Sequence, residues 1–315
     1  MTITTWHRPL LWLAAGMGLL ALVSIVGAIV DPREITGANA WFKPLKFALS
    51  IGIYAVSLAW ILGLLQRRQR FFWAIGTISV IALIAEVVII VGAVVLGTTS
   101  HFNVATPLNA ALWGVMAFSI VVVWMLALVV SIALFRADLG DRARTVAIRA
   151  GALLAVVGMG LAFLMSSPTA EQLADLQGVA GAHAVGVADD GPGLPVLGWS
   201  TVAGDLRIPH FVGMHALQVF PLLALGLEIA SRRVPLLRVA EVRRRLIWVA
   251  VAAFTATIGV LTWQALSGQS IVQPSGPILA AGIVVAVAAS IGAVVAVVAR
   301  RRIPVAGKSD YDIAS

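Results

Sequence analysis

Long uninterrupted runs of apolar residues make up most of the chain, and short polar segments separate them. Each run is about 20 residues long, which matches the thickness of the hydrocarbon core of a bilayer. A backbone inside hydrocarbon must satisfy its own hydrogen bonds, and a helix does so within one segment. The pattern therefore predicts an all-α, polytopic integral membrane helix bundle, a single transmembrane domain over residues 1–315, with about eight spans at roughly 10–30, 46–65, 71–97, 109–135, 147–166, 209–230, 246–264 and 277–299.

The composition and the placement of charge agree with this pattern. The chain is 60% hydrophobic and 11% charged, whereas soluble domains carry about 25% charged residues. If every predicted span crosses, all but four of the 22 basic residues lie on the same side of the membrane. Basic flanks stay in the cytoplasm, so we expect a multi-pass protein of the cell (plasma) membrane with both termini cytoplasmic. Membrane lipids are its expected partners, and nucleic acid is not, because this topology accounts for the basic excess.

The segment 167–208 is the one long stretch without an apolar run, and the topology makes it an extracytoplasmic loop. Connections of that length are usually functional or disordered. A short helix is expected at 168–177, with Ser167 or Thr169 as its N-cap.

The residues for several familiar chemistries are absent from the chain. It has no cysteine, which excludes disulfides, thiolate metal sites, iron–sulfur clusters and covalently attached c-type haem. It also has no late buried lysine for retinal, no aspartate-rich diphosphate motif, no G-x-S-x-G or H-E-x-x-H motif and no glycine-rich phosphate loop. Candidate chemistry must therefore come from isolated polar residues in and beside the spans.

Three of the four basic residues on the outer side, Lys43, Lys46 and Arg207, lie in the short stretches WFKPLK and GDLRIPH. Lysines at a helix end often only anchor it, with their stems in lipid and their charges at the interface. At 100° per residue, however, the polar residues below Lys46 form one stripe about 80° wide, made of Ser50, Tyr54 and Ser57. Such a stripe faces protein or water, which favours a binding site.

Glu86 is the only acidic residue deep in a predicted span. It lies about 16 Å below the outer end of its helix, where an ionisable group is costly and marks a candidate functional site. Small residues share its helix face, which allows close packing and points Glu86 into the bundle. The alternative is a protonated carboxyl that only hydrogen-bonds a neighbour such as Tyr54.

Four of the five histidines fall on the predicted outer side: His101, His183, His210 and His215. His101 and Asn103 follow the third span in the stretch TTSHFN. A lone histidine there is more often an ordinary loop residue, so the distribution of histidines does not by itself assign a site.

The stretch GDLRIPHFVGMHALQ, residues 204–218, carries polar groups directly into the sixth span. His210 and His215 lie about 140° apart on a helix, so they cannot chelate one metal in the manner of H-E-x-x-H. Gln218 falls between them, which predicts a helix that lines a cavity with its polar face. Pro221 leaves the carbonyl of Leu217 without its donor, which predicts a kink or a bound group there.

The second, third and sixth spans therefore each carry a polar face at the outer end, and we infer that they form one outward-facing pocket. Its mouth would hold Lys43, Lys46, His101, Asn103, Arg207 and His210. Its floor would hold Tyr54, Glu86, His215 and Gln218. The eighth span has no polar face and is expected at the edge of the bundle.

The first functional hypothesis is a membrane-embedded enzyme, or a redox or ligand-binding site, for a small or lipidic anion at the outer face. Its catalytic acid–base groups would be Glu86, His215, His210 and Tyr54. Its substrate-binding residues would be Lys43, Lys46, Arg207, Asn103 and Gln218. The cofactor would be a metal ion held by His101, His210 and His215, or a b-type haem. The residues do not decide between catalysis and binding alone.

Two alternatives remain open. A proton-coupled transporter would use Glu86 and His215 to relay protons, although the sequence shows no inverted repeat of the kind common in transporters. A non-catalytic membrane sensor or scaffold would bind a small ligand without turnover, although the chain has no evident cytoplasmic output domain.

Overall fold

The chain forms a bundle of long helices in the computed structural model, which describes residues 6–298. Within that range, seven helices are long and apolar enough to cross a membrane, and a bent pair makes an eighth span if it crosses as one. The predicted all-α polytopic bundle is confirmed, while the basic residues of the C-terminal segment lie outside the described range. The seven are α1 (Arg8–Val30), α2 (Phe42–Leu64), α3 (Gln69–Val95), α4 (Pro107–Leu134), α5 (Arg142–Gly160, continued by the 3₁₀ turn η2, Leu161–Met165), α9 (Ala240–Leu266) and α10 (Gly276–Val298).

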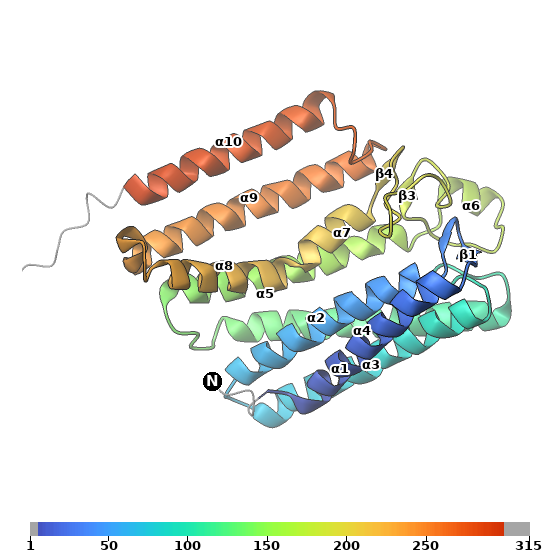
Figure 1. The fold of residues 1–315 in the computed structure, drawn as a ribbon, viewed down its shortest axis with the longest axis horizontal. Coiled ribbons are helices and arrows are strands. Elements are labelled where there is room, and N and C mark those ends of the chain that lie inside the picture. The colour runs from blue at the N-terminus through green and yellow to red at the C-terminus, as the bar shows by residue number, and fades with distance from the viewer. Residues whose placement is uncertain (1–5, 299–315) are drawn as a thin grey trace, which may run out of the picture.

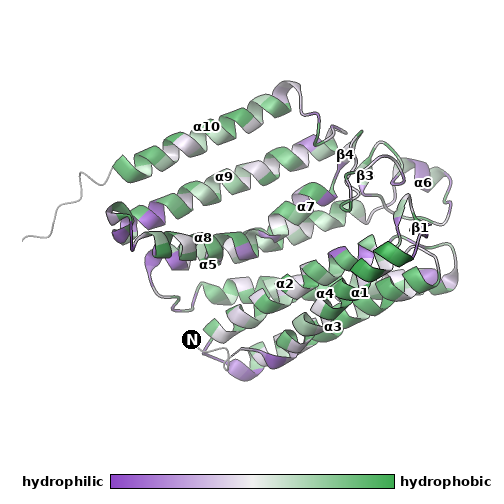
Figure 2. Cartoon of the chain, viewed as in Figure 1, coloured by the Kyte–Doolittle hydropathy of each residue, from purple (hydrophilic) through white to green (hydrophobic). Residues whose placement is uncertain are grey.

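The outer surface of the bundle is apolar along the length of the helices. Large hydrophobic side chains such as Trp12 and Ile29 are more than three-quarters exposed, and polar residues concentrate at the helix ends (Figure 2). A helix bundle in water would present a polar face to its surroundings. This surface instead suits hydrocarbon, in which the helices also satisfy their own backbone hydrogen bonds.

The helices pack around α5, which contacts α4, α7, α8 and α9. The other half of the bundle is built from α1 on α2, α2 on α3 and α3 on α4. α10 packs chiefly against α9 and lies at the edge of the bundle (Figure 1), as its lack of a polar face predicted.

The connecting segments divide between the two ends of the bundle (Figure 1). One end, called here the hairpin end, carries segments 31–41, 96–106, 166–206 and 267–275. The other, called the arginine end, carries segments 65–68, 135–141 and 231–239, which include the 3₁₀ turn η3 (Pro235–Arg238). At the hairpin end, β1 (Glu34–Ile35) pairs with β2 (Ala38–Asn39), and β3 (Ala184–Val185) pairs with β4 (Gly204–Asp205), both antiparallel.

A short helix, α6 (Ala170–Ala174), lies in the long segment at the hairpin end. Thr169 caps it, and the Gln172 side chain accepts from the Thr169 backbone N–H to complete a capping box. The short helix and its threonine cap are confirmed.

The bent pair consists of α7 (Arg207–Met214) and α8 (Ala216–Ala230), which meet at an angle of 42°. The predicted kink at Pro221 is wrong in position: α8 continues through the proline, and the bend lies at His215. The cause is that α7 is held separately against α5, where the backbones of Gly158 and Gly213 touch. The imidazole of His210 also bonds the Gly158 carbonyl at 2.8 Å.

The Gly158–Gly213 contact generates a stability prediction. A Cβ at Gly158 would overlap the backbone of Gly213 and Met214, whereas a Cβ at Gly226 would meet no atom within 4 Å. We expect Gly158→Ala to lower the free energy of unfolding by about 1–3 kcal/mol, the usual cost of overpacking. The matched control Gly226→Ala should be neutral or slightly stabilising, because alanine is the better helix former. Thermal unfolding in detergent, followed by tryptophan fluorescence, measures both; equal melting temperatures would contradict the contact.

Candidate functional site

A cavity of about 1700 Å³ opens at the hairpin end of the bundle. Its walls come from α2, α3, α4, α7 and the end of α5, and from parts of segments 31–41, 96–106 and 166–206. Sites for drug-sized ligands usually measure about 300–1,000 Å³, so this cavity is large. Most of its lining is apolar, and aromatic side chains contribute much of it: Phe42, Phe47, Phe102, Trp113, Phe163, Trp199, Phe211 and Phe254.

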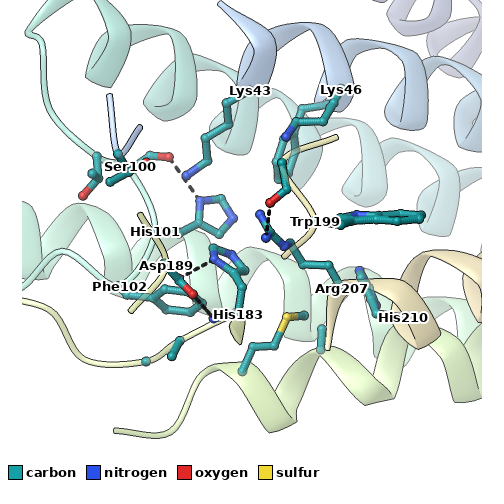
Figure 3. A pocket seen from close by; sticks show the side chains of 18 of the residues that line it. Lys43, Lys46, Ser100, His101, Phe102, His183, Asp189, Trp199, Arg207 and His210 are labelled. Carbon is teal, nitrogen blue, oxygen red and sulfur yellow. Dashed lines mark hydrogen bonds and ion pairs between the residues drawn. The ribbon is translucent and has the colours of Figure 1, made fainter. Parts of the chain in front are cut away.

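Three cations line the cavity (Figure 3): Lys43 and Lys46 from the first turns of α2, and Arg207 from the start of α7. Arg207 forms a two-pronged ion pair with the buried Asp205, at 2.6 and 2.9 Å, and donates to the Gly198 carbonyl. Lys46 Nζ donates to the Leu197 carbonyl at 2.9 Å. Within residues 6–298, no hydrogen bond or ion pair to the Lys43 amine is found. The charge of Arg207 is therefore balanced, while both lysine charges lack a carboxylate partner.

Carboxylates that the sequence did not single out lie at the outermost part of the cavity. Glu34, Glu171 and Asp190 are exposed and contribute to its lining. The mouth therefore carries both signs of charge, with the acidic groups on the solvent side of the half-buried lysines. No helical periodicity marks these positions, so the sequence offered no signal for them.

His101 is surrounded by aromatic rings and lies next to Lys43. Its ring centroid is 5.3 Å from that of Phe47 and 5.6 Å from that of Trp113, and Nδ1 bonds Ser100 Oγ at 3.1 Å. Burial lowers the pKa of His101, and the nearby charges of Lys43 and His183 lower it further. The imidazole is therefore neutral at physiological pH.

His183 and Asp189 form a tight pair on the cavity wall (Figure 3) that the sequence did not predict as a site. Nδ1 of His183 is 2.6 Å from Asp189 Oδ2, and the carboxylate also accepts the backbone N–H groups of His183 and Ala184. Burial acts to raise the pKa of Asp189, but these hydrogen bonds hold it at about 2. Burial lowers the pKa of His183, and Asp189 opposes that shift.

Phe102 separates the two loop histidines. Its ring centroid is 5.0 Å from that of His183 and 6.1 Å from that of His101. Its backbone has φ of 61°, in the left-handed region that non-glycine residues seldom adopt. Strain of this kind concentrates at functional sites, and here it places an aromatic ring against both imidazoles.

His210 and His215 line the cavity from the bent pair α7–α8. Nδ1 of His210 bonds the Gly158 carbonyl at 2.8 Å, and Nδ1 of His215 lies 3.3 Å from Gln218 Oε1. Gln218 itself does not line the cavity; its Nε2 donates to Ser57 Oγ at 2.9 Å and links α8 to α2.

Asn103 also lies outside the lining and instead forms hydrogen bonds within its own loop, to Thr98, Thr99 and Ala105. Gln218 and Asn103 are therefore not part of the cavity wall, and their expected substrate-binding roles stay predictions.

The three histidines expected to share a metal ion are not brought together as one ligand group. In the part of the chain that the structure describes, no three His, Asp, Glu or Cys side chains are close enough to hold an ion. Each imidazole is oriented by a different neighbour: Ser100 holds His101, Gly158 holds His210 and Gln218 holds His215.

Glu86 and Tyr54 lie on the cavity wall among buried residues of α3 and α2. Glu86 is 1% exposed and Tyr54 is 8% exposed. Neither oxygen of the carboxyl group has a hydrogen-bond partner in the described residues, and neither does the tyrosine hydroxyl. The alternative, in which Glu86 hydrogen-bonds a neighbour such as Tyr54, is therefore not what the structure shows. Buried polar groups are normally partnered, so these two are candidates to meet a ligand or water in the cavity.

The structure thus places eight of the predicted site residues on one cavity: Lys43, Lys46, Tyr54, Glu86, His101, Arg207, His210 and His215. Their catalytic and binding roles stay predictions. Comparison of the chain with protein-family models, with curated proteins and with solved structures finds no match.

Proposed function

We propose that the cavity binds an amphipathic anion that enters from outside the cell, with its charged group at Lys43 and Lys46 and its apolar part among the aromatic residues. The observation that carries this proposal is the Lys43 amine, which faces a largely apolar cavity without a partner in the described residues.

The cation cluster supports an anionic ligand on electrostatic grounds. Lys43 lies within reach of the positive charges of Lys46 and Arg207, and of the carboxyl groups of Glu86 and Asp189, which partly offset them. Like charges at partly buried positions repel one another more strongly than in water. Asp205 forms its direct ion pair with Arg207. A carboxylate, sulfonate or phosphate between the two lysines would relieve the remaining repulsion and accept charge-assisted hydrogen bonds.

The rest of the cavity supports a ligand with a large apolar part. The exposed carboxylates Glu34, Glu171 and Asp190 would repel a small free anion as it approached. Burial of apolar surface contributes about 25 cal/mol per Å². A ligand whose apolar part fills the aromatic-lined space therefore gains binding free energy that a small anion lacks. A lipidic substrate fits both features.

Proton-transfer groups stand around this binding site. Glu86, Tyr54, His210 and His215 all line the cavity, and each is of a type that acts as a general acid or base. A reaction on the bound anion would use them, which keeps a membrane-embedded enzyme within the proposal.

A second candidate function is proton-coupled transport, and the unpartnered carboxyl group of Glu86 favours it. An ionisable group that is deep in a membrane helix and faces a cavity is typical of proton relays. Glu86 would then exchange its proton as the anion arrives at Lys43, and His215 would continue the relay.

The placement of the cavity at the hairpin end also supports an orientation. The arginine end carries most of the described basic residues, and such flanks stay in the cytoplasm. In a plasma membrane the cavity would therefore open outward, and both termini would be cytoplasmic.

Lys43→Gln should weaken binding of a fluorescent hexadecanoate by about tenfold or more, because a hydrogen bond to a charged group contributes about 1.5–3 kcal/mol. Lys43→Gln combined with Lys46→Gln should lose more. Arg33→Gln is the matched control, since Arg33 lies at the same end and pairs with Asp31 outside the cavity. Titration of purified protein in nanodiscs of zwitterionic lipid measures the affinity. Equal binding of hexadecyltrimethylammonium, or no effect of the lysine changes, would contradict the proposal.

Glu86→Gln should abolish proton flux into proteoliposomes on addition of hexadecanesulfonate, whose head group stays ionised and carries no proton itself. Binding of the probe should remain, because Glu86 lies within electrostatic reach of Lys43 but forms no ion pair with either lysine in the described residues. Glu34→Gln, an exposed carboxyl at the rim, is the control and should keep the flux. Binding by the wild-type protein without any proton flux would reject transport and leave the binding proposal intact.

The orientation can be tested cleanly because the chain has no cysteine of its own. Asp175→Cys at the hairpin end should react with a membrane-impermeant maleimide in intact cells. Asp138→Cys at the arginine end should react only after permeabilisation. Both aspartates are exposed, so accessibility in the protein is matched, and the reverse labelling pattern would invert the topology.

A further inference from the structure

The four histidines at the hairpin end share one arrangement. His101, His183, His210 and His215 all line the cavity. In each, Nδ1 is held by an oxygen atom, which belongs respectively to Ser100, Asp189, Gly158 and Gln218. No hydrogen bond to the Nε2 atom of these four rings is found within residues 6–298.

The partners fix the tautomer of three of these rings. A backbone carbonyl and an ionised carboxylate only accept, so Nδ1 carries the proton in His210 and His183. For His215 the chain of bonds is longer: Ser57 donates to the Ile53 carbonyl, so it accepts from Gln218 Nε2, and Gln218 Oε1 then accepts from His215. In its neutral form, each of these rings therefore has an unprotonated Nε2, the form in which imidazole binds a metal.

This arrangement is typical of metal-ligating histidines, which donate the other ring N–H to a carboxylate, a carbonyl or water. A bare ion, however, takes three or four protein ligands, and no such group exists among the described residues. A metalloporphyrin supplies four nitrogen ligands itself and needs only one or two from the protein. The separate Nε2 atoms of these histidines therefore fit a metalloporphyrin and not a bare ion.

We propose that the amphipathic anion of this cavity is haem or a closely related metalloporphyrin, with Nε2 of His183 as an axial ligand and the propionates at Lys43 and Lys46. This inference rests on the proposed function and names its ligand class. His183 is chosen because its support is the most rigid: the Asp189 carboxylate that orients it is itself fixed by two backbone N–H groups.

The rest of the cavity matches the shape and charge of this ligand. The two propionates lie on one edge of the macrocycle, and the two lysines without a carboxylate partner lie three residues apart on α2. The flat apolar ring has aromatic surfaces to pack on, including Phe102, Trp113 and Phe211. The cavity of about 1700 Å³ exceeds the usual volume of a small-ligand site and accommodates a macrocycle with its substituents.

The experiment compares the binding of haemin with that of metal-free protoporphyrin to the purified full-length protein. Absorbance and fluorescence quenching measure the affinity of each probe. The two probes share shape and propionates and differ in the iron. We expect haemin to bind at least about tenfold tighter and to show the Soret band of a histidine-ligated haem. His183→Ala should remove that band and the tenfold advantage while protoporphyrin and hexadecanoate still bind, which also shows that the variant is folded. The double change Lys43→Gln with Lys46→Gln should weaken both porphyrins alike.

A second pair of variants tests Asp189 as a positioning residue. Asp189→Asn should lower haemin affinity about 10–100-fold, as loss of such a support does for metal ligands, and should shift the Soret band. Asp175→Asn, at an exposed carboxylate of the same segment outside the cavity lining, should leave both unchanged.

The outcomes separate the two proposals. Hexadecanoate binding without any preference for haemin over protoporphyrin overturns the haem inference and leaves the proposed function. A Soret band that survives His183→Ala but is lost in His210→Ala overturns the choice of His183. Absence of binding by hexadecanoate and both porphyrins overturns the proposed function together with the inference.

Discussion

The constraint on which this structure depends is that polar groups within hydrocarbon need partners, because no water is there to replace them. Most of the hydroxyl groups in the spans find a hydrogen-bond partner within their own helix. Ser24, Ser79 and Thr262, for example, each donate to a carbonyl one turn earlier. Six buried side-chain atoms in the described residues lack a partner, and three of them belong to Glu86 and Tyr54. Those two face the same cavity as the unpaired Lys43, so unmet polarity is concentrated where a ligand can reach it.

The sequence predicted the helices well because one rule decides them: a run of apolar residues long enough to cross a bilayer has no alternative to helix. It also predicted which faces of α2 and α3 are polar, since both helices are continuous and 100° per residue holds along them. The same helical geometry predicted the wrong direction for the Gln218 side chain. It assumed an unbroken helix from His210, and the bend at His215 turns the later residues so that Gln218 faces Ser57 instead of the cavity. His183 and Asp189 were missed for another reason: they lie in a loop, where no periodicity reports direction.

One contact between α5 and α7 determines the bend between α7 and α8 and the orientation of His210 in the cavity. Only glycine lets the two backbones touch at Gly158 and Gly213, and that approach brings His210 within 2.8 Å of the Gly158 carbonyl. The carbonyl is available because α5 tightens into the 3₁₀ turn η2 just beyond it. Held in this way, α7 cannot continue in line with α8, and the bend follows. The packing of two small residues thus determines both the path of the sixth span and the orientation of an imidazole in the cavity.

The order of charges along the cavity restricts what can bind there. Exposed carboxylates lie at the rim, half-buried lysines lie beneath them, and the buried Glu86 lies on the wall of α3. A small anion meets repulsion at the rim and finds little apolar contact inside, while a cation meets the lysines. A ligand with its anionic groups on one edge and a broad apolar body satisfies the lysines and the aromatic lining together. If that ligand also carries a metal, the Nε2 atom of His183 is already oriented by Asp189 before it arrives, so binding needs little rearrangement of the protein.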